Sequence, residues 1–80
     1  MIIKNIEQLK ELSKNGLDCH IRLNFGLRSS KHIYYNEDVN TFEVINHIDD
    51  SEQTLTEEQL FNEDYTNIGI ALKSNALIKD

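Results

Sequence analysis

The sequence contains no proline, no tryptophan and only one cysteine, and these absences limit the kind of protein it can be. Cys19 cannot form an internal disulfide or a zinc site of the CxxC type, although an intermolecular disulfide stays open. A lone thiol is typical of a reducing compartment. No apolar run approaches the roughly 20 residues that span a bilayer, and the N-terminus lacks the pattern of a signal peptide. We therefore expect a cytoplasmic protein without a membrane segment.

The length and composition predict one small folded domain covering residues 1–80. The chain has 39% hydrophobic and 28% charged residues, which is within the range of globular proteins. A domain of this size buries only about 60–65% of its unfolded surface, so a stability of a few kcal/mol is expected. A partner or a second copy of the chain could add to that stability.

Residues 4–14 show the apolar spacing of an amphipathic helix, and Asn15-Gly16 supplies a left-handed stop. Three later segments, 18–25, 31–35 and 41–47, alternate apolar and polar residues with a period of two, which is typical of half-buried strands. The helix would bury Ile2, Ile6, Leu9 and Leu12. The strands would bury Cys19, Ile21, Leu23, Phe25, Ile33, Tyr35, Phe42 and Val44.

Two further helix starts follow a polar connection at residues 49–53. Thr56 and Gln59 form a capping box, and Leu55 and Leu60 have the spacing of a hydrophobic staple. Thr66 could cap a second helix over residues 67–73, which Asn75 would end. Residues 76–78 could add a short edge strand.

The predicted fold class is therefore α+β. We expect an N-terminal helix, a three-stranded antiparallel β-meander and one or two C-terminal helices on one face of the sheet.

Charge is distributed very unevenly along the chain. Residues 1–35 carry six basic and three acidic residues, a net charge of +3. Residues 36–72 carry ten acidic residues and no Lys or Arg, a net charge of −10. Self-repulsion makes such a block costly, so it can indicate a functional acidic face that occupies a basic groove built for phosphates. The alternative is a solvated acidic surface without a binding role.

The acidic block gives the candidate partner-binding residues. A basic stripe with interleaved aromatic residues is absent from the sequence, so direct binding of nucleic acid is disfavoured, and Arg28 and Lys31 in the first turn are too few to change this. The candidate residues are Glu37, Asp38, Glu43, Asp49, Asp50, Glu52, Glu57 and Glu58.

His20, His32 and His47 share the outward face of the meander, which raises the possibility of a metal site. If Leu23 lies opposite Ile33, then His20 faces Asn36, and His20 and His32 are about 13 Å apart. Zinc ligands must converge within about 2.1 Å of one ion, so this register argues against a metal site. A different register would bring the histidines closer together.

Other chemistry is not favoured by the sequence. Arg22, Tyr34 and Glu43 should form a row across three strands, either as ordinary cross-strand stabilisation or, with an exposed Ile45, as a contact patch. Cys19 alternates onto the apolar face, where a thiol is usually an inert core residue. The acidic residues lack EF-hand spacing, and no cofactor motif is present. We therefore expect a non-enzymatic protein without a cofactor.

Several segments resemble small uncharacterised proteins of Gram-positive bacteria and of their phages and plasmids. They are LNFGLRSSKHI, FEVINHIDDSEQTLTEEQL and TNIG, and the resemblance covers residues from about Leu9 to Ile78. It implies a role on mobile elements, where small acidic inhibitors of host defence such as anti-CRISPR proteins and DNA mimics are found.

These observations lead to two functional hypotheses. The first is a non-catalytic inhibitor that uses its acidic 36–64 region to block a basic, nucleic-acid-binding surface on a protein partner. The second is a small interaction module that forms a homodimer through its open sheet face or an edge strand, with an incidental acidic surface.

Overall fold

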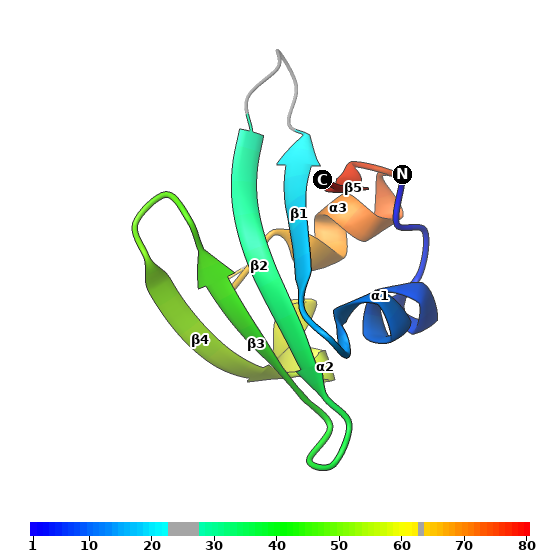
Figure 1. The fold of residues 1–80 in the computed structure, drawn as a ribbon. Helices are drawn as coiled ribbons and strands as arrows, with labels where there is room; N and C mark the ends of the chain where they lie inside the picture. The colour runs from blue at the N-terminus through cyan, green and yellow to red at the C-terminus, as the bar shows by residue number, and fades with distance from the viewer. Residues whose placement is uncertain (23–27, 63) are drawn as a thin grey trace.

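The structure, a computed structural model that describes residues 1–22, 28–62 and 64–80, is a five-stranded antiparallel sheet with three helices on one face (Figure 1). This confirms the α+β class and the N-terminal helix, but the sheet has five strands where three were predicted in the meander. The elements are α1 (Ile6–Ser13), β1 (Leu17–Arg22), β2 (Arg28–Asn36), β3 (Thr41–Asn46), β4 (Ser51–Thr56), α2 (Glu57–Leu60), α3 (Ile68–Lys73) and β5 (Leu77–Lys79).

The strand order is β4-β3-β2-β1-β5, so β1, β2 and β3 form the predicted meander at the centre of the sheet. The C-terminal strand β5 pairs with β1 at one end, as predicted for residues 76–78. Ile2 forms an isolated bridge with Ile78, and the Ile3 amide donates to the Leu77 carbonyl at 2.9 Å. The two termini therefore lie close together at the β5 end of the sheet (Figure 1). β4 is the terminal strand at the other end.

The core lies between the sheet and the helices. All six predicted inward-facing strand residues that the structure describes are buried, whereas Leu23 and Phe25 lie outside the described residues. Leu9, Leu60 and Ile68 contribute one fully buried side chain from each helix. The predicted role of Ile2 is wrong, because Ile2 precedes the helix and is exposed while Ile3 is buried. The six confirmed residues are Cys19, Ile21, Ile33, Tyr35, Phe42 and Val44.

The predicted register between the first two strands is wrong. Ile33 is paired with Leu17, and His20 is paired with Ser30 rather than with Asn36. The pairing is shifted by six residues from the prediction. β1 ends at Arg22 instead of residue 25 and β2 begins at Arg28 instead of residue 31, so each strand contributes three residues to the shift. Side chains alternate with a period of two, so a shift by an even number leaves every residue on its predicted face. The core prediction therefore survives the register error. Lys31 lies within β2 on the buried side, not in a turn.

Two hairpin loops of the same design connect β2 to β3 and β3 to β4. In each, the asparagine that ends the first strand accepts a hydrogen bond from the amide two residues on: Asn36 from Asp38 and Asn46 from Ile48, both at 3.1 Å. The last loop residue, Asn40 or Asp50, has a left-handed backbone with φ of 55° or 57°. Asn and Asp suit both positions because they form Asx turns and tolerate left-handed conformations.

The sequence predicted a polar connection at residues 49–53, but strand β4 begins at Ser51, directly after the second hairpin loop. Residues 51–54 are all exposed and only Leu55 of this strand is buried, opposite Phe42. A strand at the end of a sheet can extend beyond the helices that cover the core, so its sequence need not alternate. Backbone pairing with β3 over Thr41–Asn46 holds the strand in place instead of side-chain burial.

Both predicted C-terminal helices are present. The capping box at Thr56 and Gln59 is confirmed by reciprocal hydrogen bonds of 3.2 and 3.0 Å. α3 begins at Ile68, one residue later than predicted, and Asn67 precedes it without a side-chain cap hydrogen bond. The buried Thr66 hydroxyl accepts from the Ile68 amide at 3.3 Å, as expected of a capping residue, and donates to the Leu60 carbonyl at 2.7 Å. Asn75 ends α3 with φ of 55°, as predicted. Among residues 1–22, 28–62 and 64–80, no helix is long and apolar enough to cross a membrane.

Substitution of Gly69 by alanine tests the packing of α3. In a solvent-exposed helix this change stabilises by about 1 kcal/mol through helix propensity. Here a Cβ atom would lie 2.9 Å from the Phe61 Cα and 2.7 Å from its Cδ1. The Phe61 Cα atom belongs to the backbone and cannot move aside as the end of a flexible side chain can. We therefore expect Gly69→Ala to lower the free energy of unfolding by about 1–3 kcal/mol, measured by urea unfolding. Lys73→Ala, an exposed position of the same helix, should change stability by less than about 0.5 kcal/mol. Increased stability of Gly69→Ala would contradict the packing described.

Candidate functional site

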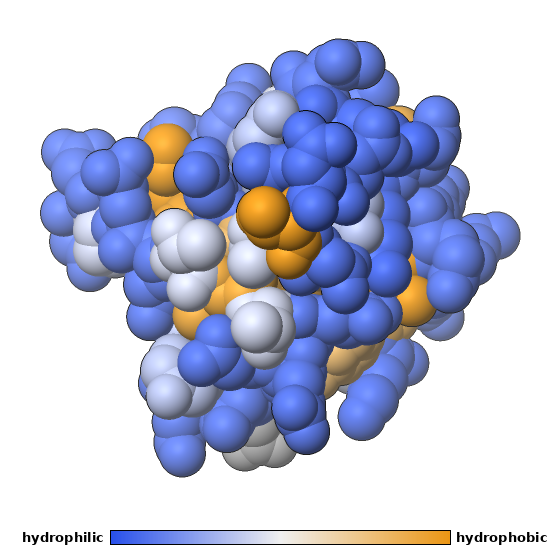
Figure 2. Space-filling view, turned by 90° about the horizontal axis from the view of Figure 1, so that it is seen from below, coloured by the Kyte–Doolittle hydropathy of each residue, from blue (hydrophilic) through white to orange (hydrophobic). Residues whose placement is uncertain are grey.

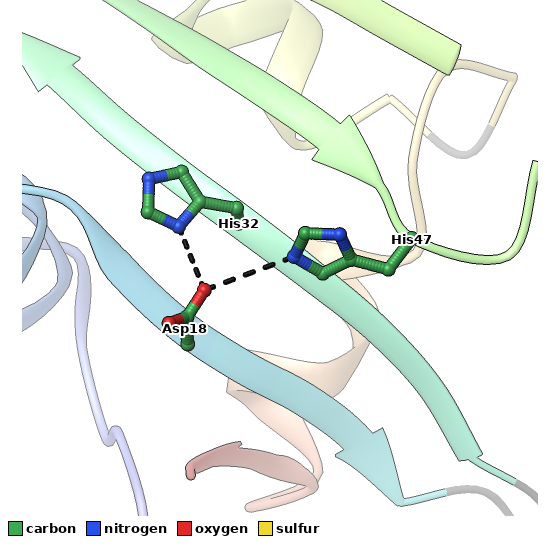
Figure 3. A group of neighbouring side chains, drawn as sticks. All are labelled: Asp18, His32 and His47. Atoms are coloured by element: carbon green, nitrogen blue, oxygen red, sulfur yellow. Dashed lines mark hydrogen bonds and ion pairs between the residues drawn. The ribbon is translucent and has the colours of Figure 1, made fainter. Parts of the chain in front are cut away.

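Three polar side chains meet on the open face of the sheet, away from the helices. Asp18 on β1 is directly opposite His32 on β2, and His47 immediately follows β3. The His32 Nδ1 atom lies 2.7 Å from the Asp18 Oδ1 atom, and the His47 Nε2 atom lies 3.7 Å from the same oxygen. Figure 3 shows both rings directing a nitrogen toward the carboxylate. The potential ligand atoms of all three residues lie within 4.8 Å of one another.

Local backbone structure fixes the orientation of these side chains. Gly16 has φ of +89°, and a Cβ atom there would lie 3.1 Å from the His32 Cε1 and Nε2 atoms. The absence of a side chain at Gly16 thus leaves room for the imidazole ring, whose Nδ1 edge faces Asp18. His47 is anchored by its amide, which donates to the Ser30 carbonyl at 3.0 Å. The turn glycine and the end of β3 together position the two rings.

The cluster is open to solvent and carries a carboxylate with a lowered pKa. The side chains of His32, His47 and Asp18 are 35%, 47% and 66% exposed. The hydrogen bond from His32 is the main cause that lowers the pKa of Asp18. Chemically, the arrangement can act as a cross-strand ion pair when the histidines are protonated, or can offer two imidazole nitrogens and one carboxylate oxygen to a metal ion.

The structure separates His20 from the other two histidines. His20 is only 8% exposed, and its Nδ1 atom forms a hydrogen bond with the Asp80 carboxylate. Its Nε2 atom is buried and has no hydrogen-bond partner within the described part of the chain. The prediction against a metal site used an incorrect β1–β2 register and considered only His20 and His32. It left out the β2–β3 pairing, which sets His32 opposite Ile45, two residues before His47.

Sequence reasoning missed Asp18 altogether. Its signal was present, because Asp18 lies two residues before His20 and therefore shares the outward face of β1. Only the register shows that it faces His32. The predicted row across three strands is also incomplete: Tyr34 is opposite Glu43, but Arg22 is opposite Arg28 at the far end of the hairpin. Ile45, predicted to be exposed, is partly buried.

The predicted acidic residues are spread over the β3–β4 side of the molecule and α2. Glu37 and Asp38 occupy the β2–β3 loop, and Asp49 and Asp50 occupy the β3–β4 loop. Glu43 and Glu52 lie on the two strands with side chains on the open face. Glu57 and Glu58 form the first turn of α2. Seen from the end that carries the β2–β3 loop, the surface is largely hydrophilic, with hydrophobic side chains visible only in small areas (Figure 2).

Two of these carboxylates are already paired with lysines of α1 or its C-cap. Lys14 contacts Glu37 at 3.4 Å and Glu11 at 3.2 Å, and these hydrogen bonds raise the pKa of Lys14. Lys10 contacts Glu57 at 3.5 Å. Among the side chains that the structure describes, which exclude those of residues 23–28 and 63, the other six form no ion pair: Asp38, Glu43, Asp49, Asp50, Glu52 and Glu58.

A groove of about 500 Å³ lies between β1 and α3. Ile21, Ile70 and Ala71 supply much of its apolar lining, and Arg22 is the one titratable group among the described residues that line it. Acid–base catalysis needs titratable groups that are perturbed by one another in a cleft, and this lining does not provide such a pair. The groove is therefore not the candidate site.

Neither a protein-family model nor a curated protein nor a solved structure matches the chain.

The reactivity of Cys19 tests whether it is a core residue or a functional thiol. The residue is fully buried opposite Lys31, and burial raises the pKa of its thiol to about 12. A thiolate is the reactive form, so we expect Ellman's reagent to label the folded protein only as fast as the protein opens. The same protein in concentrated guanidinium should react at once. Rapid labelling under native conditions would contradict a buried, structural Cys19.

Proposed function

We propose that the protein is a non-catalytic binding protein whose acidic β3–β4 side contacts a basic surface on a protein partner. The partner is a nucleic-acid-binding protein, and the carboxylates occupy the surface on which it would otherwise hold phosphates. The biological setting we propose is inhibition of a host defence system by a phage or plasmid protein, as DNA mimics and anti-CRISPR proteins do.

The observation that supports this function is the spatial separation of charge. The strand order places β3, β4 and the loops that precede them, which contain no Lys or Arg, at the β4 end of the sheet, and the N-terminal segment with its net positive charge forms α1, β1 and much of β2. The asymmetry along the sequence therefore becomes an asymmetry across the molecule. Charge concentrated on one side steers association with an oppositely charged partner and accelerates encounter.

The exposed edge of β4 favours a second candidate, a homodimer formed by pairing this strand with its copy. Residues 51–54 of β4 are exposed, and terminal strands offer unpaired backbone groups to another chain. The edge carries Glu52 and follows a loop with Asp49 and Asp50, so two copies would bring like charges together. A basic partner would meet no such repulsion, and we therefore place the homodimer second.

Affinity capture at two salt concentrations tests the first candidate. The tagged protein, incubated with a bacterial host lysate, should retain basic nucleic-acid-binding proteins at about 0.1 M salt. It should release them near 1 M, where the Debye length falls to about 3 Å. Mass spectrometry identifies what is captured. Capture that does not depend on salt, or no specific capture, would reject the acidic surface as the binding site.

A charge-matched pair of variants locates the surface. Glu43→Gln with Glu52→Gln removes two exposed carboxylates from the hairpin and should weaken capture several-fold. Glu7→Gln with Glu11→Gln removes the same charge from α1 and should have little effect. Equal loss in both variants would indicate a dependence on net charge alone. Light scattering after size exclusion separates the candidates, since a stable dimer would favour the homodimer.

A further inference from the structure

We propose that Asp18, His32 and His47 form a binding site for a divalent late first-row metal ion of the Zn²⁺ class. The site uses the middle of the sheet and is independent of the acidic β3–β4 surface. It offers the His32 Nδ1 atom, the His47 Nε2 atom and a carboxylate oxygen of Asp18 to one ion.

The donor set defines the class of metal. Two imidazoles and one carboxylate suit Zn²⁺, Ni²⁺ and Cu²⁺, whereas Mg²⁺ and Ca²⁺ prefer ligand sets made of oxygen atoms. The three donors leave at least one coordination position for water or for a ligand from another molecule. A negatively charged chain, with a net charge of −6, also favours a cation.

Each distance between ligand atoms must change by no more than about 1.5 Å, because the three ligand atoms already lie within 4.8 Å of one another. Ligand atoms around a tetrahedral zinc ion are about 3.3 Å apart, given bond lengths near 2.0 Å. The 3.7 Å between His47 Nε2 and Asp18 Oδ1 is close to that spacing, and the 2.7 Å between His32 Nδ1 and Asp18 Oδ1 must lengthen by less than 1 Å. The exposed Asp18 and His47 side chains can adjust by rotation. The His32 ring, next to Gly16, already presents the required nitrogen.

Backbone structure makes the site partly preorganised. Asp18 and His32 are a direct cross-strand pair. The His47 amide donates a hydrogen bond to the carbonyl of Ser30, two residues before His32 on β2. Two donors therefore come from paired strand positions, and the third comes from the first residue of the β3–β4 loop, whose amide is hydrogen-bonded to β2. Sites on strands hold ligand geometry more precisely than sites on loops.

Titration calorimetry with Zn²⁺, in a buffer that does not chelate metal, tests the proposal on the full chain. We expect one ion to bind per chain. Asp18→Asn, His32→Gln and His47→Gln should each reduce the association constant at least about tenfold, because each removes a direct ligand. Glu7→Gln removes an exposed carboxylate from α1, away from the site, and should leave binding unchanged.

Imidazole nitrogen NMR provides a second readout that needs no variant. Addition of Zn²⁺ should shift the His32 Nδ1 and His47 Nε2 resonances together. His20, held at Asp80 outside the site, serves as the internal control and should not shift. Absence of binding, equal binding in the ligand variants and wild type, or shifts confined to His20 would each overturn the proposal and leave the cluster as a cross-strand ion pair.

Discussion

The pairing of β1 with β2 is the constraint on which the rest of the structure depends. Leu17 and Ile33, directly opposite each other and both buried, fix this register beneath the helices. The same register puts Asp18 opposite His32 on the other face. One backbone alignment therefore determines both the central part of the core and the Asp18–His32 pair of the polar cluster.

Much of the fold could be predicted because the face of a strand residue depends only on whether its position is odd or even. The alternation from Cys19 to Ile21 and from Phe42 to Val44 identified the core even though the predicted register was six residues out. The capping box at Thr56 is a local signal and was equally reliable. β4 escaped prediction because a terminal strand with one buried residue has no hydrophobic pattern to detect.

The polar cluster could not be predicted for the opposite reason. Contact between Asp18, His32 and His47 needs the absolute register of two hairpins, which depends on where β2 begins and on the length of each loop. Residue patterns do not specify the register. The β2–β3 loop shows that loop chemistry carries part of this information, since its Asx turn at Asn36 and left-handed Asn40 recur as Asn46 and Asp50 in the β3–β4 loop.

The arrangement divides the molecule into regions with different properties. The helix-covered face is scaffold, the β3–β4 side gathers carboxylates, and the centre of the open face holds two imidazoles beside a carboxylate. The proposed binding function and the proposed metal site use different parts of this surface. Both depend on the sheet order, which follows from the β1–β2 alignment and the two similar loops.

Cross-strand NOEs measured by NMR test this alignment most directly. The account predicts backbone NOEs that link Asp18 with His32 and His20 with Ser30, in keeping with the antiparallel pairing of β1 and β2. NOEs linking His20 with Asn36 would contradict it, because that register would separate Asp18 from His32 and remove the polar cluster.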